Sequence, residues 1–79
     1  MSYSPSESAA IGHRAAALVK ARAAAEGTSI WAQTRKIDVS RQQFYQWARV
    51  NGVAPSALIL SRMAYYGYDV GYILTGQES

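Results

Sequence analysis

The chain has 79 residues, which is enough for one domain with a small core. Its 8 Lys and Arg against 5 Asp and Glu give a formal charge of +3, a small excess that favours a polyanionic partner mainly if the bases cluster. With no Cys there is neither a disulfide framework nor a thiolate site, and no apolar run approaches the roughly 18 residues that span a bilayer.

The N-terminus, MSYSPSES, lacks the charged and apolar regions of a signal peptide, so we expect a cytoplasmic protein without membrane contact. The 49% of hydrophobic residues are too many for a disordered chain. We therefore expect a single domain over residues 1–79, with an ordered core over about 5–76 and flexible ends.

The first predicted helix runs to Glu26. Ser4 or Ser6 supplies its cap, Pro5 its first turn, and Gly27 its end. Apolar residues recur along it at helical spacing: Ile11, Ala15, Leu18 and Val19.

A short second helix follows, capped by Thr28 or Ser29 and running to about Lys36. Its inner side is predicted at Ile30, Thr34 and Ile37. Residues 37–39 then form a turn in which Asp38, one of the few non-Gly residues that tolerate a positive φ, is expected to adopt one.

The central stretch, VSRQQFYQWARV over residues 39–50, predicts a third helix. Ser40 and Gln43 form a capping box at its start, and Val39 with Phe44 forms the matching hydrophobic staple. At 100° per residue the inner face contains Phe44, Trp47, Ala48 and Val50, and the outer face contains Arg41, Gln42, Tyr45, Gln46 and Arg49.

The outer face of this helix contains no acid, whereas a solvated helix usually mixes Glu with Lys. Arg can pair in bidentate fashion with guanine and Gln with adenine, and Tyr can donate to a phosphate or pack on a thymine methyl. The helix alone fits equally well a nucleic-acid reader and a polar surface that happens to lack acids.

Two more helices are predicted after Asn51 and Gly52. The fourth has Pro55 at its first position, is apolar on more than one side, and is expected to be the best buried element; its apolar residues are Leu58, Ile59, Leu60, Met63, Ala64 and Tyr66. The fifth runs from Val70 to Thr75, capped by Asp69 and ended by Gly76. The predicted fold class is all-α, a compact bundle of about five short helices.

The order of these elements resembles the lambda-repressor-like helix-turn-helix DNA-binding domain, most closely the N-terminal domains of phage CI-type repressors. The resemblance covers about residues 11–76, and its most specific parts are VSRQQFYQW, Pro55 and the segment Gly67 to Gly76. Two positions depart from the family pattern in ways that bear on the packing of the second helix: Gln33 replaces an aliphatic residue and Asp38 replaces Gly. Ile30 stands where a phosphate-binding Gln is frequent.

The resemblance implies a set of DNA contacts. Its base-reading positions match Ser40, Arg41, Gln42, Tyr45 and Gln46. Its phosphate contacts match the region of Ser29, Ile30, Arg49 and Asn51. The nearby basic residues Arg35 and Lys36 are expected to add further contacts with the DNA backbone.

We therefore expect a sequence-specific regulator of transcription, a phage-derived repressor that binds double-stranded operator DNA as a homodimer. The expected dimer surface is the Tyr-rich end, comprising Tyr65, Tyr68, Tyr72 and Ile73, although these tyrosines also fit a plain solvated surface. The alternative is a protein-binding module on the same fold, such as an antitoxin, antirepressor or anti-CRISPR-associated regulator, that presents Tyr45, Tyr65, Tyr66 and Tyr68 to a protein.

Catalysis is the least expected function. His13 is the only His and is predicted at the surface, and the five acids show no paired spacing. We expect no metal site, no cofactor and no small-molecule substrate.

Overall fold

The computed structural model describes residues 5–77 of the chain. This part folds into five α-helices joined by loops and contains no strand. The helices are α1 (Pro5–Glu26), α2 (Ile30–Lys36), α3 (Arg41–Ala48), α4 (Ala57–Tyr65) and α5 (Val70–Thr75). The predicted all-α bundle is confirmed, although its first helix, with 22 residues, is long. The predicted cap Ser4 lies outside the described residues, as do residues 1–3 and 78–79 of the ends expected to be flexible, 1–3 and 77–79.

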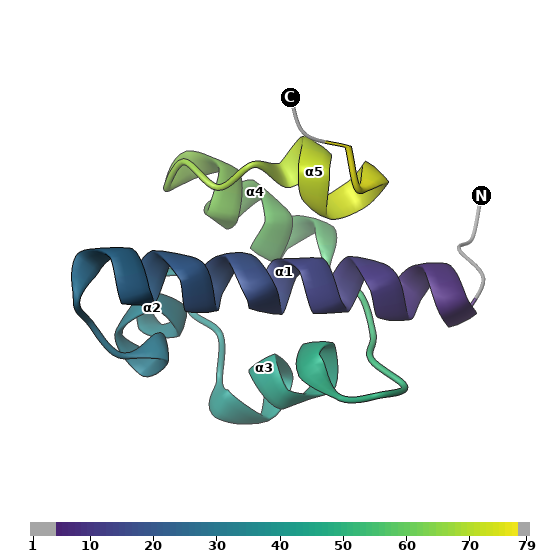
Figure 1. The fold of residues 1–79 in the computed structure, drawn as a ribbon, viewed down its shortest axis with the longest axis horizontal. Coiled ribbons are helices and arrows are strands. Elements are labelled where there is room, and N and C mark those ends of the chain that lie inside the picture. The colour runs from purple at the N-terminus through teal and green to yellow at the C-terminus, as the bar shows by residue number, and fades with distance from the viewer. Residues whose placement is uncertain (1–4, 78–79) are drawn as a thin grey trace.

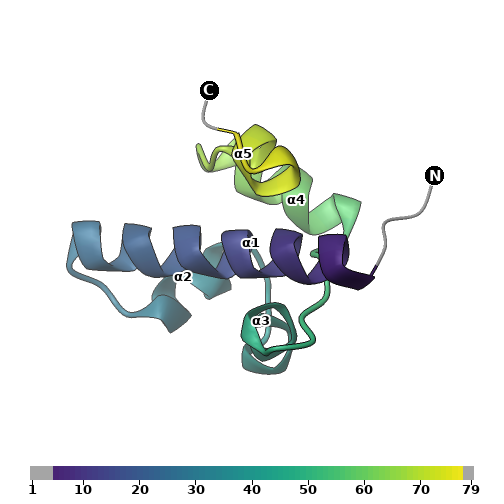
Figure 2. The same ribbon diagram turned by 45° about the vertical axis from the view of Figure 1, so that its right-hand side comes forward.

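Helix α1 forms the middle of the molecule, with α2 and α3 on one side and α4 and α5 on the other (Figures 1 and 2). It packs against α2, α3 and α5, and α4 packs against α5. Small side chains allow this close approach, since Ala15 and Ala16 are buried beside Ile11 and Val19. The centre of the core is completed from the other helices and loops by Ile37, Phe44, Trp47, Met63 and Ile73.

The helix starts agree closely with the local sequence signals. The Ser29 hydroxyl accepts from the Ala32 N–H at the start of α2. Both halves of the predicted capping box of α3 are present, because Gln43 N–H donates to Ser40 Oγ and Ser40 N–H donates to Gln43 Oε1. Asp38 has the expected positive φ, 57°. The direction in which α3 leaves α2 is thus fixed by residues 37–40.

Helix α4 differs from its prediction in both start and burial. Ser56 caps it and Pro55 is buried before the cap, so the helix begins two residues later than expected. Only Ile59 and Met63 are buried, whereas Leu58 is 59% exposed. The prediction that α4 is the best buried element is wrong, because α1 occupies the centre and α4 covers the core with one face only.

Val50 also departs from its predicted inward position, since it is 88% exposed. Helix α3 ends at Ala48, and Arg49 is already extended with ψ of 166°. The helical periodicity that placed Val50 beside Trp47 therefore stops before it reaches Val50.

Candidate nucleic-acid interface

The outer face of α3 is exposed to solvent as its sequence predicts. The first turn contributes Arg41 and Gln42, and the second contributes Tyr45, which is 59% exposed, and Gln46. Together with Ala48 and Arg49 they line a shallow hollow on the surface, and no acid contributes to it. Helix α3 lies on the side of α1 opposite α4 and α5 (Figure 1), and Arg41 at its start also lines a second hollow together with Leu58 and Arg62 of α4.

Three other predicted DNA contacts lie in the segments that flank α2 and α3. Ser40 is exposed, but its hydroxyl already accepts the Gln43 N–H, so its first role is to cap α3. Asn51 is exposed in the loop after α3, and Ser29 is exposed at the start of α2. The structure thus leaves each of these side chains open to solvent without showing a ligand for it.

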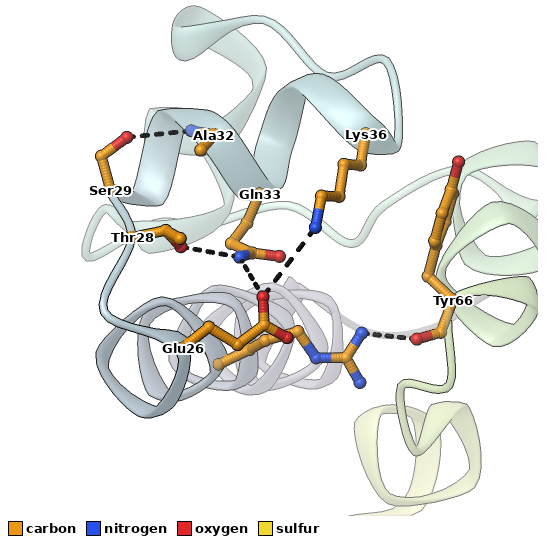
Figure 3. Close-up of polar contacts among 8 residues, drawn as sticks. Glu26, Thr28, Ser29, Ala32, Gln33, Lys36 and Tyr66 are labelled. Atoms are coloured by element: carbon orange, nitrogen blue, oxygen red, sulfur yellow. Dashed lines mark hydrogen bonds and ion pairs between the residues drawn. The ribbon is translucent and has the colours of Figure 1, made fainter.

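Two acids near α3 are each paired with a cation of another helix. Lys36 Nζ lies 3.8 Å from Glu26 Oε1, on the α1 side of α2 (Figure 3). In the turn between α2 and α3, Asp38 Oδ2 lies 3.7 Å from Arg62 Nη1. Among residues 5–77 neither Arg41 of α3 nor Arg49, which caps the C-terminus of α3, forms an ion pair, so both cations remain available to an anionic ligand. The sequence placed Arg49 on the outer face of the helix, but the helix ends before it.

Trp31 of α2, for which no role was predicted, packs against Arg41, Phe44 and Tyr45 of α3. The Arg41 guanidinium carbon lies over its ring, 4.7 Å from the centroid. Tyr45 meets the same ring edge-on with centroids 5.7 Å apart, and the buried Phe44 does so at 5.6 Å. The sequence does place this large aromatic residue directly after Ile30, which was predicted to face inward. Its contact with Arg41 could not be predicted, because it depends on the angle between α2 and α3.

A network of side-chain hydrogen bonds docks α2 onto the end of α1. The amide of Gln33, which is 1% exposed, donates from Nε2 to Glu26 Oε1 at 2.9 Å and to Thr28 Oγ1 at 2.8 Å (Figure 3). A buried amide is stable only when it is hydrogen-bonded, and these acceptors supply that requirement. Gln33 therefore joins α2 to the end of α1 through a buried polar contact.

The other end of α3 is fixed to α1 by close backbone approach. A Cβ on Gly12 would lie 2.4 Å from the Val53 carbonyl oxygen and 2.9 Å from that of Trp47. Nearby, His13 Nε2 and the Arg49 carbonyl oxygen lie 2.6 Å apart. His13 is exposed as predicted, but it also anchors the loop in which Arg49 lies, a role that the sequence did not reveal.

The predicted dimer surface requires a correction. Ile73 is 0% exposed and Tyr68 is 8% exposed, so both belong to the interior of the protomer. Tyr72 is half-buried, and only Tyr65, at 84%, is fully open. Ile73 faces inward because α5 packs on α1 as well as on α4, and Tyr68, in the loop before α5, packs under the guanidinium of Arg22 from α1.

The described residues contain no group of three or more His, Cys, Asp or Glu positioned to hold a metal ion. No helix within residues 5–77 is both long and apolar enough to cross a membrane. Comparison with protein-family models, curated proteins and solved structures finds no match for this chain.

Proposed function

We propose that the protein is a sequence-specific DNA-binding regulator of transcription, in which α2, the turn at residues 37–40 and α3 act as a helix-turn-helix. The observation that supports this most directly is the exposed, acid-free surface formed by the outer face of α3, with one Arg, two Gln and one Tyr, and by its C-cap Arg49. A helix that presents such side chains fits the major groove of B-DNA, which is wide enough to admit it.

The proposed contacts divide into two groups. Arg41, Gln42 and Gln46 lie on the exposed part of α3 and read base edges, with each bidentate pair discriminating by about 1–3 kcal/mol. Arg49 and Arg35 bind the phosphate backbone and fix the register. Lys36 contributes less, because part of its charge is already neutralised by Glu26.

Selection from a randomised duplex library tests this function directly. The wild-type protein should recover a defined sequence, and Gln42→Ala and Gln46→Ala should each lose preference at particular base pairs. Gln77→Ala, which removes an exposed Gln after α5, is the matched control and should leave the preference intact. If both α3 variants weakened binding to every duplex equally, neither glutamine would be a base reader.

For Arg49→Ala we expect the contrasting result, a uniform loss of affinity. Because each neutralised phosphate releases counterions, the variant should also reduce the slope of log affinity against log salt by about 1. An unchanged salt slope would remove Arg49 from the backbone contacts.

A second candidate function is recognition of another protein. It is favoured by the exposed apolar side chains of the α4 region, namely Leu58, Tyr65 and Tyr66. Failure of the wild-type protein to select any duplex, together with loss of a protein partner on Tyr65→Ala, would support this function over DNA binding.

A further inference from the structure

Trp31 connects two exposed side chains of α3 to the core. It is half-buried, and it packs against the hydrophobic core on the side of Phe44. Its other contacts are the guanidinium of Arg41 over its ring and the edge of Tyr45. Arg41, Phe44 and Tyr45 stand at positions i, i+3 and i+4 of α3, so a single indole of α2 contacts one whole side of the first turn.

We propose that Trp31 is a specificity-determining positioning residue, which holds the Arg41 guanidinium at the start of α3 so that its N–H edge faces one base pair. This inference rests on the proposed DNA-binding function. It assigns to α2 a part in base recognition, in addition to any contact that α2 makes with phosphates.

The chemistry of the two side chains supports this role. A guanidinium is planar and its five N–H donors lie at its edges, so an aromatic ring over its face leaves those donors free for guanine. Among the aromatic side chains, indole attracts a cation most strongly. Among residues 5–77 Arg41 forms no ion pair, and Asp38, which lines the same hollow as Trp31 and Arg41, is paired with Arg62.

The expected effect is on specificity more than on overall affinity. A free Arg side chain loses considerable rotamer entropy when it is fixed at a base, and it can instead reach a neighbouring phosphate, which carries no sequence information. A guanidinium that is already held over Trp31 avoids part of that loss. Removing the ring should therefore weaken discrimination at the base pair that Arg41 contacts.

The test combines selection from a randomised duplex library with a double-mutant cycle. Arg41→Ala first identifies the base pair at which preference is lost. Trp31→Leu should lower discrimination at that same base pair by about two- to fivefold, the value of an exposed cation–π contact. Trp31→Phe should restore most of it, and the Trp31→Leu/Arg41→Ala double variant should be no worse than Arg41→Ala alone.

A variant that lowers stability elsewhere in the protein shows whether Trp31 acts by positioning Arg41 or only by stabilising the fold. Ile73→Val shortens a fully buried side chain of α5 and should lower the Tm without changing base preference. Trp31→Leu should change base preference at a temperature well below its own Tm. Thermal unfolding of each variant provides the comparison.

Three results would overturn the proposal. If Trp31→Leu reduced preference evenly at all positions, or if its effect added fully to that of Arg41→Ala, Trp31 would not act through Arg41. If wild-type and Trp31→Leu proteins selected the same sequence with equal discrimination, DNA binding would stand and the role of Trp31 would fall. If the wild-type protein selected no sequence, both the proposed function and this inference would fail.

Discussion

Tyr68 shows how burial changes the chemistry of a single side chain. Its hydroxyl is buried and has no hydrogen-bond partner among the described residues, while the Arg22 guanidinium carbon lies 3.8 Å from its ring centroid. Burial raises the pKa of the Tyr68 phenol above its ordinary value, and the positive charge of Arg22 offsets part of the rise. The folded protein therefore holds this proton more tightly than the unfolded chain does.

The consequence for stability follows from that difference. Unfolded Tyr68 loses its proton near pH 10, so its contribution to stability is fully present below that pH and is lost as the pH rises through the higher folded value. Tyr68→Phe should match or exceed the wild type at pH 7, within about 1 kcal/mol, because no hydrogen bond is lost.

Between pH 9 and 11 the Tm of the Tyr68→Phe variant should fall less than that of the wild type. Thermal unfolding of both proteins across that range measures the difference. A variant that is clearly less stable at pH 7 would show that the hydroxyl has a partner in solution.

At the scale of single elements, signals confined to a few neighbouring residues predicted most of what the structure shows. The capping box of α3 and the positive φ of Asp38 depend on atoms within three residues, so their geometry could be predicted from the sequence. The start of α4 was misplaced because Pro55 and Ser56 carry adjacent start signals, and Ser56 is the actual cap.

Contacts between distant elements could not be predicted in this way. Arg14 donates from Nε to the Ile73 carbonyl oxygen at 2.8 Å, and Arg22 donates to that of Tyr66. In the sequence both arginines look like solvated residues of a helix, and only the position of the C-terminal helices beside α1 gives them partners. The same placement buries Ile73, which a short helix pattern cannot assign to one side.

The junction of α1 with α3 supplies a prediction about an element. In Gly12→Ala the new methyl group would meet the backbone oxygens of Trp47 and Val53, which cannot rotate away as a side chain can. We expect a loss of about 1–3 kcal/mol in the free energy of unfolding, the usual cost of overpacking, measured by denaturant titration.

Gly71→Ala in α5 is the matched control for Gly12→Ala. Its Cβ would meet only Asp69 Oδ1, at an ordinary 3.4 Å, and Ala favours a helix over Gly by about 0.5–1 kcal/mol. The control variant should therefore be neutral or more stable. If Gly12→Ala behaved like Gly71→Ala, the close approach of α1 and α3 would not be a constraint on the fold.

At the scale of the whole molecule, the two sides of α1 carry different surfaces. The side with α3 carries Arg41 and Arg49, neither of them in an ion pair among residues 5–77, and Leu58 at the start of α4 lines a hollow together with Arg41. Tyr65, at the end of α4, is 84% exposed and does not line that hollow. This separation fits the proposed function, since a single small DNA-binding unit gains affinity and specificity when two copies bind two half-sites about 34 Å apart. A dimer through the Tyr65 end of α4 would leave the outer face of α3 free in both copies.

Tyr65→Glu tests this arrangement. In a two-fold symmetric interface each residue near the axis meets its own copy, so the variant would place like charges together and oppose association. We expect the wild type to sediment as a dimer and the variant as a monomer at the same concentration, and cooperative binding of the variant to a duplex with two half-sites should be lost. Binding to one half-site should persist, because α3 is unchanged. Ala21→Glu adds the same charge to an exposed position of α1 and should affect neither measurement. A Tyr65→Glu protein that still dimerised would exclude this surface and direct the search for the interface to another face of the protomer.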